Sequence, residues 1–152
     1  IKNFGTLSPI PGLASWFSYL EENKIKNILG DFSNQDLLFL KSSNLKIGDN
    51  RIASNKEAIK KLVIHYVVNE KNQKGLPIND VSRFHLGNGA IVDDGVINAD
   101  ISEVGYKISF GVMITYLYEF KNIEKNHENY MNNKVVTCSD KLGKYLKWNI
   151  FY

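Results

Sequence analysis

Two side chains that can take part in acid–base chemistry stand beside turn-forming residues in this sequence. His85 comes at the end of a predicted strand, immediately before Gly-Asn-Gly, where a side chain can face an open cleft. Its imidazole titrates near neutral pH, which suits proton transfer. Ser8 lies in the segment Thr6 to Gly12, whose two prolines hold the residues before them in extended geometry. A hydroxyl and an imidazole together predict proton transfer or nucleophilic attack on an acyl group.

Each of these side chains also has a purely structural interpretation. His85 fits a hydrogen-bonded core histidine, and the hydroxyl of Ser8 can tie down a proline-rich turn. The neighbours of Ser8 do not form the G-x-S-x-G turn that exposes the nucleophile of many hydrolases. His65, inside a predicted helix, and His127, in a run of Asn, Lys and Glu, are predicted to be structural or solvated. Spacing alone leaves both interpretations of Ser8 and His85 open.

The length and composition predict one globular domain. With 152 residues the chain can bury a substantial core, and 43% hydrophobic with 23% charged residues excludes disorder and fibrous repeats. A net charge of +3, with the charges scattered, predicts no nucleic-acid partner. The longest apolar run, Ile108 to Tyr118, is shorter than the roughly 20 residues of a membrane span, so no membrane partner is predicted. A single cysteine, Cys138, excludes an internal disulfide framework and a multi-cysteine zinc site.

The elements that would carry Ser8 and His85 follow from hydrophobic spacing. Apolar residues at helical spacing predict helices over Leu13–Glu22, Asn34–Leu40, Ala58–Asn69 and Ser139–Leu146. Ser54 and Glu57, three residues apart, predict a capping box before the helix that reaches Asn69. Alternation and β-branched or aromatic content predict extended segments at Val81–Leu86, Ala90–Val92 and Val96–Ile97.

The stretch after these segments is predicted to be one buried helix followed by a loop. Ser102 and Glu103 are helix-start signals before the run from Val104 to Phe120, and residues 122–133 are predicted to be polar loop. Gly105 and Gly111 form neither a Rossmann nor a P-loop pattern. A glycine near a helix start nevertheless lets backbone N–H groups approach a phosphate closely.

Three long segments, in order, resemble the C-terminal catalytic domain of the malonyl-CoA decarboxylase family. They read F-G-T-L-S-P-I-P-G-L-A-S-W-F (Phe4 to Phe17), V-S-R-F-H-L-G-N-G-A (Val81 to Ala90) and A-D-I-S-E-V-G-Y-K-I-S-F-G-V-M-I-T-Y-L-Y-E (Ala99 to Glu119). Shorter echoes are I-E-K-N-H-E-N-Y (Ile123 to Tyr130) and K-V-V (Lys134 to Val136). The resemblance therefore covers nearly the whole chain.

The resemblance implies an α/β (α+β) fold of the GNAT acyltransferase type, with a mixed sheet and helices on both faces. Residues 1–152 would be the C-terminal part of the catalytic domain, without its upstream part and without the helical N-terminal domain; the start at Ile1 in place of Met fits this expectation. The implied reaction converts malonyl-CoA to acetyl-CoA and CO2 without metal or biotin. The family also forms homo-oligomers, and it occurs in mitochondria, cytoplasm or peroxisomes, so the compartment of this chain stays open.

The resemblance also assigns roles to individual residues. The catalytic serine of the family falls on Ser8, its catalytic histidine on His85 and its active-site tyrosine on Tyr118. Ser8 would bind the leaving carboxylate and His85 would donate the proton. A further family glutamate would precede Ile1.

The coenzyme A diphosphate is expected at the start of the helix after Ser102. The expected contacts there are Ser102, Glu103, Gly105 and Ser109, with Asn88 as a further contact to the coenzyme. Two departures from the family put the wall of the site in doubt: Val96 to Asp100 lacks the usual Asn-Trp pair, and Asp80 replaces a proline.

Two other functions remain as alternatives at this point. A serine hydrolase of acyl-CoA thioesters would use Ser8 as a nucleophile and form a covalent acyl-enzyme. A non-catalytic relic would bind coenzyme A without turning it over. The resemblance further predicts that Val81 to Leu86 lies beside an unpaired sheet edge, which would make the isolated chain prone to aggregation.

Overall fold

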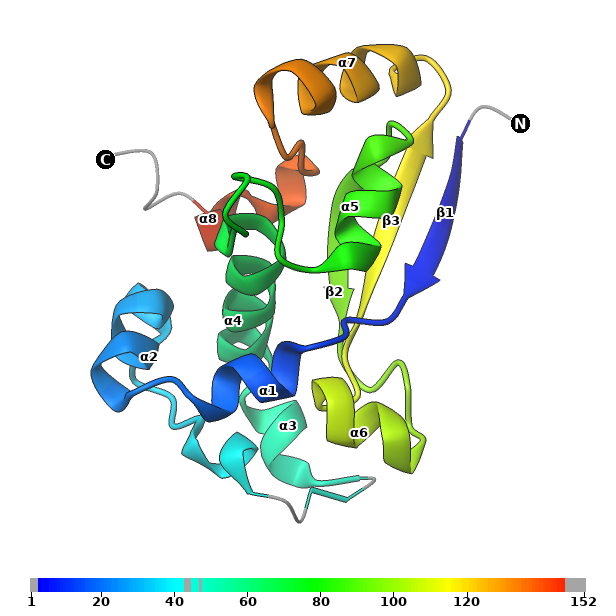
Figure 1. Ribbon diagram of the computed structural model, residues 1–152. Helices are drawn as coiled ribbons and strands as arrows, with labels where there is room; N and C mark the ends of the chain where they lie inside the picture. Colours follow the sequence, from blue (N-terminus) through cyan, green and yellow to red (C-terminus); the bar gives the residue numbers. More distant parts are fainter. Residues whose placement is uncertain (1–2, 43–44, 47, 147–152) are drawn as a thin grey trace.

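The structure is a computed structural model, and it describes residues 3–42, 45–46 and 48–146. The strands form a small sheet that lies beside a group of helices (Figure 1). The strands and α-helices are β1 (Asn3–Ser8), α1 (Leu13–Ser18), α2 (Glu22–Leu29), α3 (Asn50–Ser54), α4 (Lys56–Asn69), α5 (Asp80–Gly87), β2 (Ile91–Val96), α6 (Glu103–Ser109), β3 (Met113–Glu119), α7 (Ile123–Asn133) and α8 (Gly143–Leu146). Short 3-10 turns are η1 (Gly30–Phe32), η2 (Leu38–Lys41) and η3 (Asp140–Leu142).

The sheet has the strand order β1-β3-β2, with β3 in the centre. Both pairings are antiparallel, so the described strands do not form the mixed sheet that was expected; one parallel bridge joins Val92 to Cys138. Side chains of β3 alternate between the core and the outer face, as the pleat requires. Ile114, Tyr116 and Tyr118 point toward the helices and are buried. The expected α/β architecture, a sheet flanked by helices, is confirmed.

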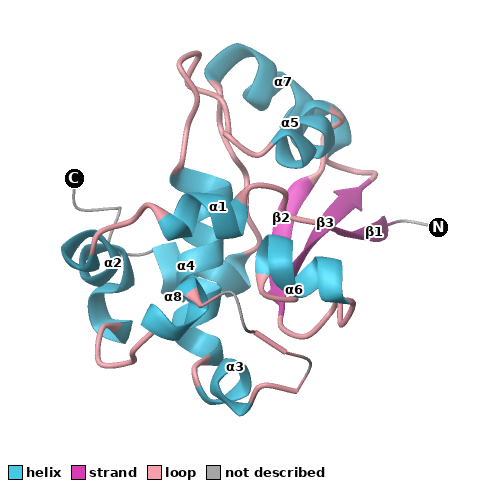
Figure 2. Ribbon diagram, turned by 60° about the horizontal axis from the view of Figure 1, so that its bottom comes forward, coloured by secondary structure: helices cyan, strands magenta, loops and turns pink. Residues whose placement is uncertain are grey.

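The helical side of the core is built around α4. This helix is buried along almost its whole length and contacts α2, α8 and β2. A helix that is apolar nearly all round belongs in the interior. Figure 2 shows the helices around α4 on one side of the molecule and the strands on the other. Within the described residues, no helix has the length and the apolar character that a membrane crossing demands.

The prediction of a strand at Val81–Leu86 is wrong, because these residues belong to α5. Asn79 caps the helix by accepting a hydrogen bond from the Val81 N–H at 3.0 Å. The buried members Ser82, His85 and Leu86 stand three and four residues apart, which is helical spacing. Alternation over six residues could not distinguish the two periods. The unpaired strand edge expected beside Val81–Leu86 is therefore not there; the edge strands of the described sheet are β1 and β2.

The single buried helix predicted over Val104–Phe120 is also wrong. It divides into α6 and β3, because Phe110 and Gly111 adopt left-handed backbone angles, with φ of 58° and 78°. Two such residues in succession end a helix and turn the chain. The apolar run after Gly111 then has the alternating burial of a strand.

Four further expectations need correction. Residues 122–133, predicted as loop, form α7 from Ile123 onward. The capping box is not formed, because Asn55 is the N-cap of α4 and Ser54 donates to the Asn50 carbonyl in α3 instead. The predicted helix at Asn34–Leu40 is reduced to the 3-10 turn η2. The predicted helix at Leu13–Glu22 is shorter than expected and ends at Ser18, whereas the helix reaching Asn69 and the non-helical segment Thr6–Gly12 are confirmed.

Candidate functional site

Ser8, His85 and Tyr118 meet in one hydrogen-bonded line, although they lie far apart in the sequence. Ser8 Oγ is 3.1 Å from His85 Nε2, and His85 Nδ1 is 2.6 Å from the Tyr118 hydroxyl. Each of the three side chains is less than a tenth exposed. Both nitrogens of the imidazole are thereby engaged, which restrains its orientation. The three residues expected to be catalytic thus come together.

Three elements position these side chains. Ser8 ends β1, and its register partner on β3 is Ile114. Thr6, two residues earlier on the same face of β1, lies 3.3 Å from Ser8 Oγ through its own hydroxyl. His85 comes from α5 and Tyr118 from β3. An edge strand, a helix and the central strand therefore each supply one member of the line.

The loop after Ser8 is held against α4. The Tyr66 hydroxyl donates to the Pro11 carbonyl at 3.2 Å. Gly12 follows with φ of 84°, and a Cβ added there would lie 2.8 Å from the same hydroxyl. Glycine is needed at this position for both reasons. The proline-rich loop thus leaves Ser8 with its end fixed to the helical core.

The surroundings of the imidazole are aromatic. The Tyr116 ring stacks on it, with centroids 4.4 Å apart and planes 22° apart, and the exposed Phe84 ring lies edge-on at 5.2 Å. Phe4 stacks on Tyr118 at 4.6 Å. Burial lowers the pKa of His85 below its ordinary value and raises the pKa of Tyr118. The imidazole is therefore mostly neutral near pH 7, and the phenol keeps its proton.

The other two histidines lie elsewhere, as the sequence predicts. His65 is buried in α4, where its Nε2 is 2.9 Å from Glu70 Oε2. Trp16 donates to the other oxygen of Glu70, which ties α1 to the same carboxylate. His127 is exposed on α7, and its Nδ1 donates to the Gly87 carbonyl at 2.6 Å. Both histidines have structural contacts.

The first turn of α6, expected to bind the coenzyme A diphosphate, is closed by its own side chains. Ser102 Oγ accepts from the Gly105 N–H at 3.0 Å, and Asp100 Oδ1 accepts from the Ser102 hydroxyl at 2.6 Å. A Cβ at Gly105 would lie 2.3 Å from Asp100 Cγ. The small residue at 105 is thus required by the Asp100 carboxyl. With Glu103 also exposed in this turn, two carboxylates stand where an anion was expected.

The remaining expected coenzyme contacts do not converge on this turn. Ser109 is buried, and its hydroxyl donates to the carbonyls of Gly105 and Val112. Asn88 is exposed and donates to the Phe84 carbonyl at the end of α5. Figure 1 shows α6 and the end of α5 at opposite ends of the sheet. Asn88 and α6 therefore cannot contact the same small group.

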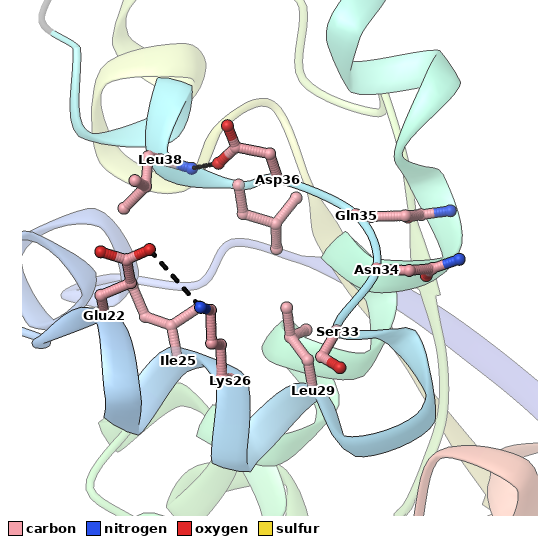
Figure 3. A pocket seen from close by; sticks show the side chains of 10 residues that line it. Glu22, Ile25, Lys26, Leu29, Ser33, Asn34, Gln35, Asp36 and Leu38 are labelled. Atoms are coloured by element: carbon pink, nitrogen blue, oxygen red, sulfur yellow. Dashed lines mark hydrogen bonds and ion pairs between the residues drawn. The ribbon is translucent and has the colours of Figure 1, made fainter.

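Hollows in the described surface lie beside helices, away from Ser8. One of about 480 Å³ lies between α1, η2 and α6, where Lys41, Glu103 and Lys107 contribute to its lining. Another of about 170 Å³ lies between α2 and residues 33–38, and Figure 3 shows the ion pair of Glu22 and Lys26 on one wall. Of the predicted site residues, only Glu103 lines either hollow.

Sequence reasoning assigned no role to three residues of the site. Thr6 lies beside Ser8, Tyr116 stacks on His85, and the Ser82 hydroxyl lies 2.6 Å from that of Tyr116. Ser82 stands three residues before His85, a spacing that becomes meaningful only when α5 is known to be a helix. Tyr116 stands two residues from Ile114 and from Tyr118, which is the spacing of side chains on one face of a strand. The helical interpretation of this run concealed that signal. Among the described residues, no group of three or more His, Cys, Asp and Glu side chains is arranged to hold a metal ion.

Comparisons with known proteins agree with the geometry. The family model described as "Malonyl-CoA decarboxylase C-terminal domain" matches residues 1–150. The mitochondrial malonyl-CoA decarboxylase of Rattus norvegicus is 28% identical over 157 residues, which cover 91% of this chain and 32% of the rat protein. The crystal structure of malonyl-CoA decarboxylase from Rhodopseudomonas palustris has a TM-score of 0.82 at 31% identity, covering 95% of this chain and 33% of that one.

A second solved structure, malonyl-CoA decarboxylase from Cupriavidus metallidurans, has a TM-score of 0.77 at 30% identity and covers 95% of this chain and 38% of that one. The chain thus spans about a third of the length of the relatives it matches. The family model and the backbone arrangement both lead to one assignment. The chain belongs to the malonyl-CoA decarboxylase family and corresponds to its C-terminal domain.

Proposed function

We propose that this chain carries the catalytic serine and histidine of a malonyl-CoA decarboxylase, which converts malonyl-CoA to acetyl-CoA and CO2. The observation that carries the proposal is the 3.1 Å contact between Ser8 Oγ and His85 Nε2, backed by Tyr118 at Nδ1. Relatives named as malonyl-CoA decarboxylases supply the substrate class. A homo-oligomer, expected from the family resemblance, remains a prediction.

Losing CO2 from a malonyl thioester requires little more than positioned hydrogen bonds. The bond between the α-carbon and the carboxylate breaks, its electron pair passes into the thioester to form an enolate, and CO2 leaves. The enolate carbon then takes up a proton and becomes the methyl group of acetyl-CoA. The barrier falls when the carboxylate is held perpendicular to the thioester plane and a donor meets the thioester oxygen. No covalent intermediate is needed.

Ser8 and His85 fit the two tasks of this reaction. The Ser8 hydroxyl holds the leaving carboxylate. His85 first takes up a proton from solvent, and the resulting imidazolium delivers its Nε2 proton to the enolate carbon and returns to the neutral form. Burial favours this role, because it lowers the pKa of His85 and makes its protonated form a stronger acid. In the neutral form the Tyr118 phenol, whose pKa is raised, donates to Nδ1 and so directs the imidazole proton to Nε2; when the imidazolium forms, the phenol oxygen accepts from the Nδ1–H instead.

The same pair of side chains raises the alternative of a thioester hydrolase with Ser8 as the nucleophile. Hydrolases of that type orient the histidine with a carboxylate, which stabilises the imidazolium. Here the partner of Nδ1 is the neutral phenol of Tyr118. Ser8 also lies at a strand end before a proline and not in a nucleophile elbow. These two features favour decarboxylation over hydrolysis.

The proposal for the coenzyme arm stays with residues 102–109 and the adjoining hollow. Lys41 and Lys107, on the walls of this hollow, supply positive charge for the phosphates. Asp100 and Glu103 oppose anion binding at the turn itself. The diphosphate would accordingly lie nearer the two lysines than the backbone of the turn.

The proposal is tested by incubating the full-length protein with malonyl-CoA and following acetyl-CoA and CO2 together. We expect Ser8→Ala to lower the rate by about two or more orders of magnitude, because the carboxylate loses its positioned donor. Ser33→Ala, which removes an exposed serine hydroxyl beside the hollow at α2, is the matched control.

Each alternative has its own outcome in the same experiment. Release of free malonate and coenzyme A, with a burst of covalent acyl-enzyme, would establish the hydrolase. Binding of coenzyme A without any product would establish the relic. Turnover of the Ser8→Ala protein at the rate of the Ser33→Ala control would remove Ser8 from the reaction.

A further inference from the structure

The imidazole of His85 needs a restraint that its own torsion angles do not provide. The second side-chain torsion of histidine has a broad energy profile, so neighbouring groups decide the plane of the ring. In the plane that the ring adopts, Nε2 lies 3.1 Å from Ser8 Oγ, and rotation about the bond to the ring moves Nε2 because this atom lies off the rotation axis. The residues that hold the plane are therefore as important to the geometry as the hydrogen-bond partners.

Helix α5 and strand β3 lie side by side, and side chains at successive positions along them form hydrogen-bonded pairs. One turn of α5 separates Ser82 from His85, and one pleat repeat of β3 separates Tyr116 from Tyr118. Ser82 contacts the Tyr116 hydroxyl, and His85 contacts the Tyr118 hydroxyl. The two hydrogen bonds thus repeat along the same helix–strand interface.

The first of these contacts fixes a ring that covers the imidazole. Ser82 Oγ and the Tyr116 hydroxyl are 2.6 Å apart, and both side chains are fully buried. The ring of the same Tyr116 stacks on His85, with 4.4 Å between the two ring centroids. Because Ser82 and His85 share one helix, the tyrosine is tied to the same element that carries the imidazole.

We propose that Tyr116 and Ser82 form a brace that sets the plane of the His85 imidazole, and that both are positioning residues for the pair Ser8 and His85. The brace consists of the stacked Tyr116 ring and the hydrogen bond between the Ser82 and Tyr116 hydroxyls, which holds this ring. Its consequence for turnover rests on the proposed function. Its consequence for the imidazole itself does not, which allows the two to be tested apart.

The experiment compares Tyr116→Leu, Tyr116→Phe and Ser82→Ala in the full-length protein. Tyr145→Phe is the control, because Tyr145 is also a buried tyrosine with a 2.6 Å hydrogen bond, to Glu57, and it lies on α8 away from His85. One measurement follows the His85 ring signals by NMR as a function of pH. The other measures kcat and KM for malonyl-CoA.

The brace predicts a graded result. In Tyr116→Leu the ring is lost and water reaches one face of the imidazole, so the titration of His85 moves up toward its ordinary value and kcat falls by about ten- to a hundredfold with KM nearly unchanged. Tyr116→Phe keeps the ring and recovers most of the kcat. Ser82→Ala resembles Tyr116→Phe, and the double variant adds little, because both remove one hydrogen bond.

The possible outcomes separate the brace from the function. If the parent protein does not decarboxylate malonyl-CoA and the His85 titration still moves in Tyr116→Leu, the brace stands and the proposed function fails. If the titration, kcat and KM of Tyr116→Leu match those of Tyr145→Phe, the brace is overturned. Should Tyr116→Leu not fold, unchanged His85 signals in both Tyr116→Phe and Ser82→Ala overturn it as well.

Discussion

Two regions of the molecule contain hydrogen-bonded polar side chains: the line through Ser8, His85 and Tyr118, and the first turn of α6. They differ in how far apart in the sequence the bonded residues lie. In the first, hydrogen bonds run between β1, α5 and β3, and Ser8 and His85 are 77 positions apart in the sequence. In the second, Asp100, Ser102 and Gly105 bond to one another within a few residues. The first arrangement exists only in the folded chain, whereas the second is local.

This difference separates a site from a cap. Side chains brought together from distant segments cost conformational entropy, and in this family a reaction gives a reason for that cost. A loop that satisfies its own donors and acceptors needs no ligand. The expectation that the turn at α6 cradles a phosphate therefore has weaker support than the expectation for Ser8 and His85.

The largest contrast is expected from His85→Ala. Loss of the proton donor should lower the decarboxylation rate by about a hundredfold or more, with the fold intact by circular dichroism. His127→Ala removes an exposed histidine whose hydrogen bond goes to the Gly87 carbonyl and not to Ser8 or His85, so it should leave the rate within about twofold. Equal rates for the two variants would contradict the role of His85.

The second contrast concerns Gly105→Ala, where the turn should fail for structural reasons. The added Cβ meets the Asp100 carboxyl at 2.3 to 2.6 Å, so we expect the free energy of unfolding in urea to fall by about 1–3 kcal/mol. Gly5→Ala is the control, because a Cβ there meets its nearest atom, the Tyr116 carbonyl oxygen, at an ordinary 3.6 Å.

A second substitution decides how the Gly105→Ala result is interpreted. Removing the carboxyl in the double variant Gly105→Ala with Asp100→Ala should restore part of the lost stability. If Gly105→Ala instead keeps its stability and loses affinity for acetyl-CoA in calorimetry, the turn is the diphosphate site after all.

A smaller effect is expected from Tyr118→Phe. This change leaves the ring stacked against Phe4 and removes the hydrogen bond to His85 Nδ1, so kcat should fall by about tenfold, the scale of one such bond. The pH profile of kcat should also shift, because the imidazole proton is no longer directed to Nε2 by the phenol. A kcat equal to that of the parent would remove Tyr118 from the mechanism.

The smallest expected effect is a difference in how the two regions make the stability of the protein depend on pH. Burial lowers the pKa of His85 below 6.5, so the unfolded chain binds more protons in the window just below that value, and stability falls as the pH falls through it. The pKa of Asp100 is lowered by its hydrogen bonds to Ser102, so its contribution is present above 3.8 and is lost only at more acidic pH.

Urea unfolding at about pH 7.5 and about pH 5.5 measures this difference in proton linkage. The buried His65 also has a lowered pKa and contributes to the same loss of stability. We therefore expect His85→Gln to reduce the loss without abolishing it, and Asp100→Asn to leave it unchanged. A loss that is the same in His85→Gln and in the parent would contradict the lowered pKa of His85.

Part of this architecture was predictable because it depends on short-range rules. The prolines around Ser8 exclude a helix there whatever the rest of the chain does, and β1 with its following loop agrees. The apolar spacing up to Asn69 predicts α4 for the same reason. The motifs around Ser8 and His85 also indicated the family, since the order of residues in a motif can be compared without knowledge of the fold.

Two segments could not be assigned from local pattern because two periods fit the same residues. Val81 to Leu86 alternates like a strand and also has helical spacing, and the Asn79 cap decides for the helix. The run after Ser102 is apolar enough for one long helix, but the left-handed backbone at Phe110 and Gly111 divides it. Contacts with other segments add to these local features, because one face of α5 is buried and β3 pairs with both β1 and β2.

The sequence by itself determined the chemistry available to this protein: a hydroxyl directly before a proline, an imidazole beside glycines and a tyrosine near the end of an apolar run. Only the tertiary structure decided that these three groups lie within hydrogen-bond reach, with Tyr116 and Ser82 around the imidazole. The physical reason is the spacing of elements. A helix advances about 4.5 Å in three residues and a strand about 6.6 Å in two, and side chains one step apart on each meet only when α5 lies along β3.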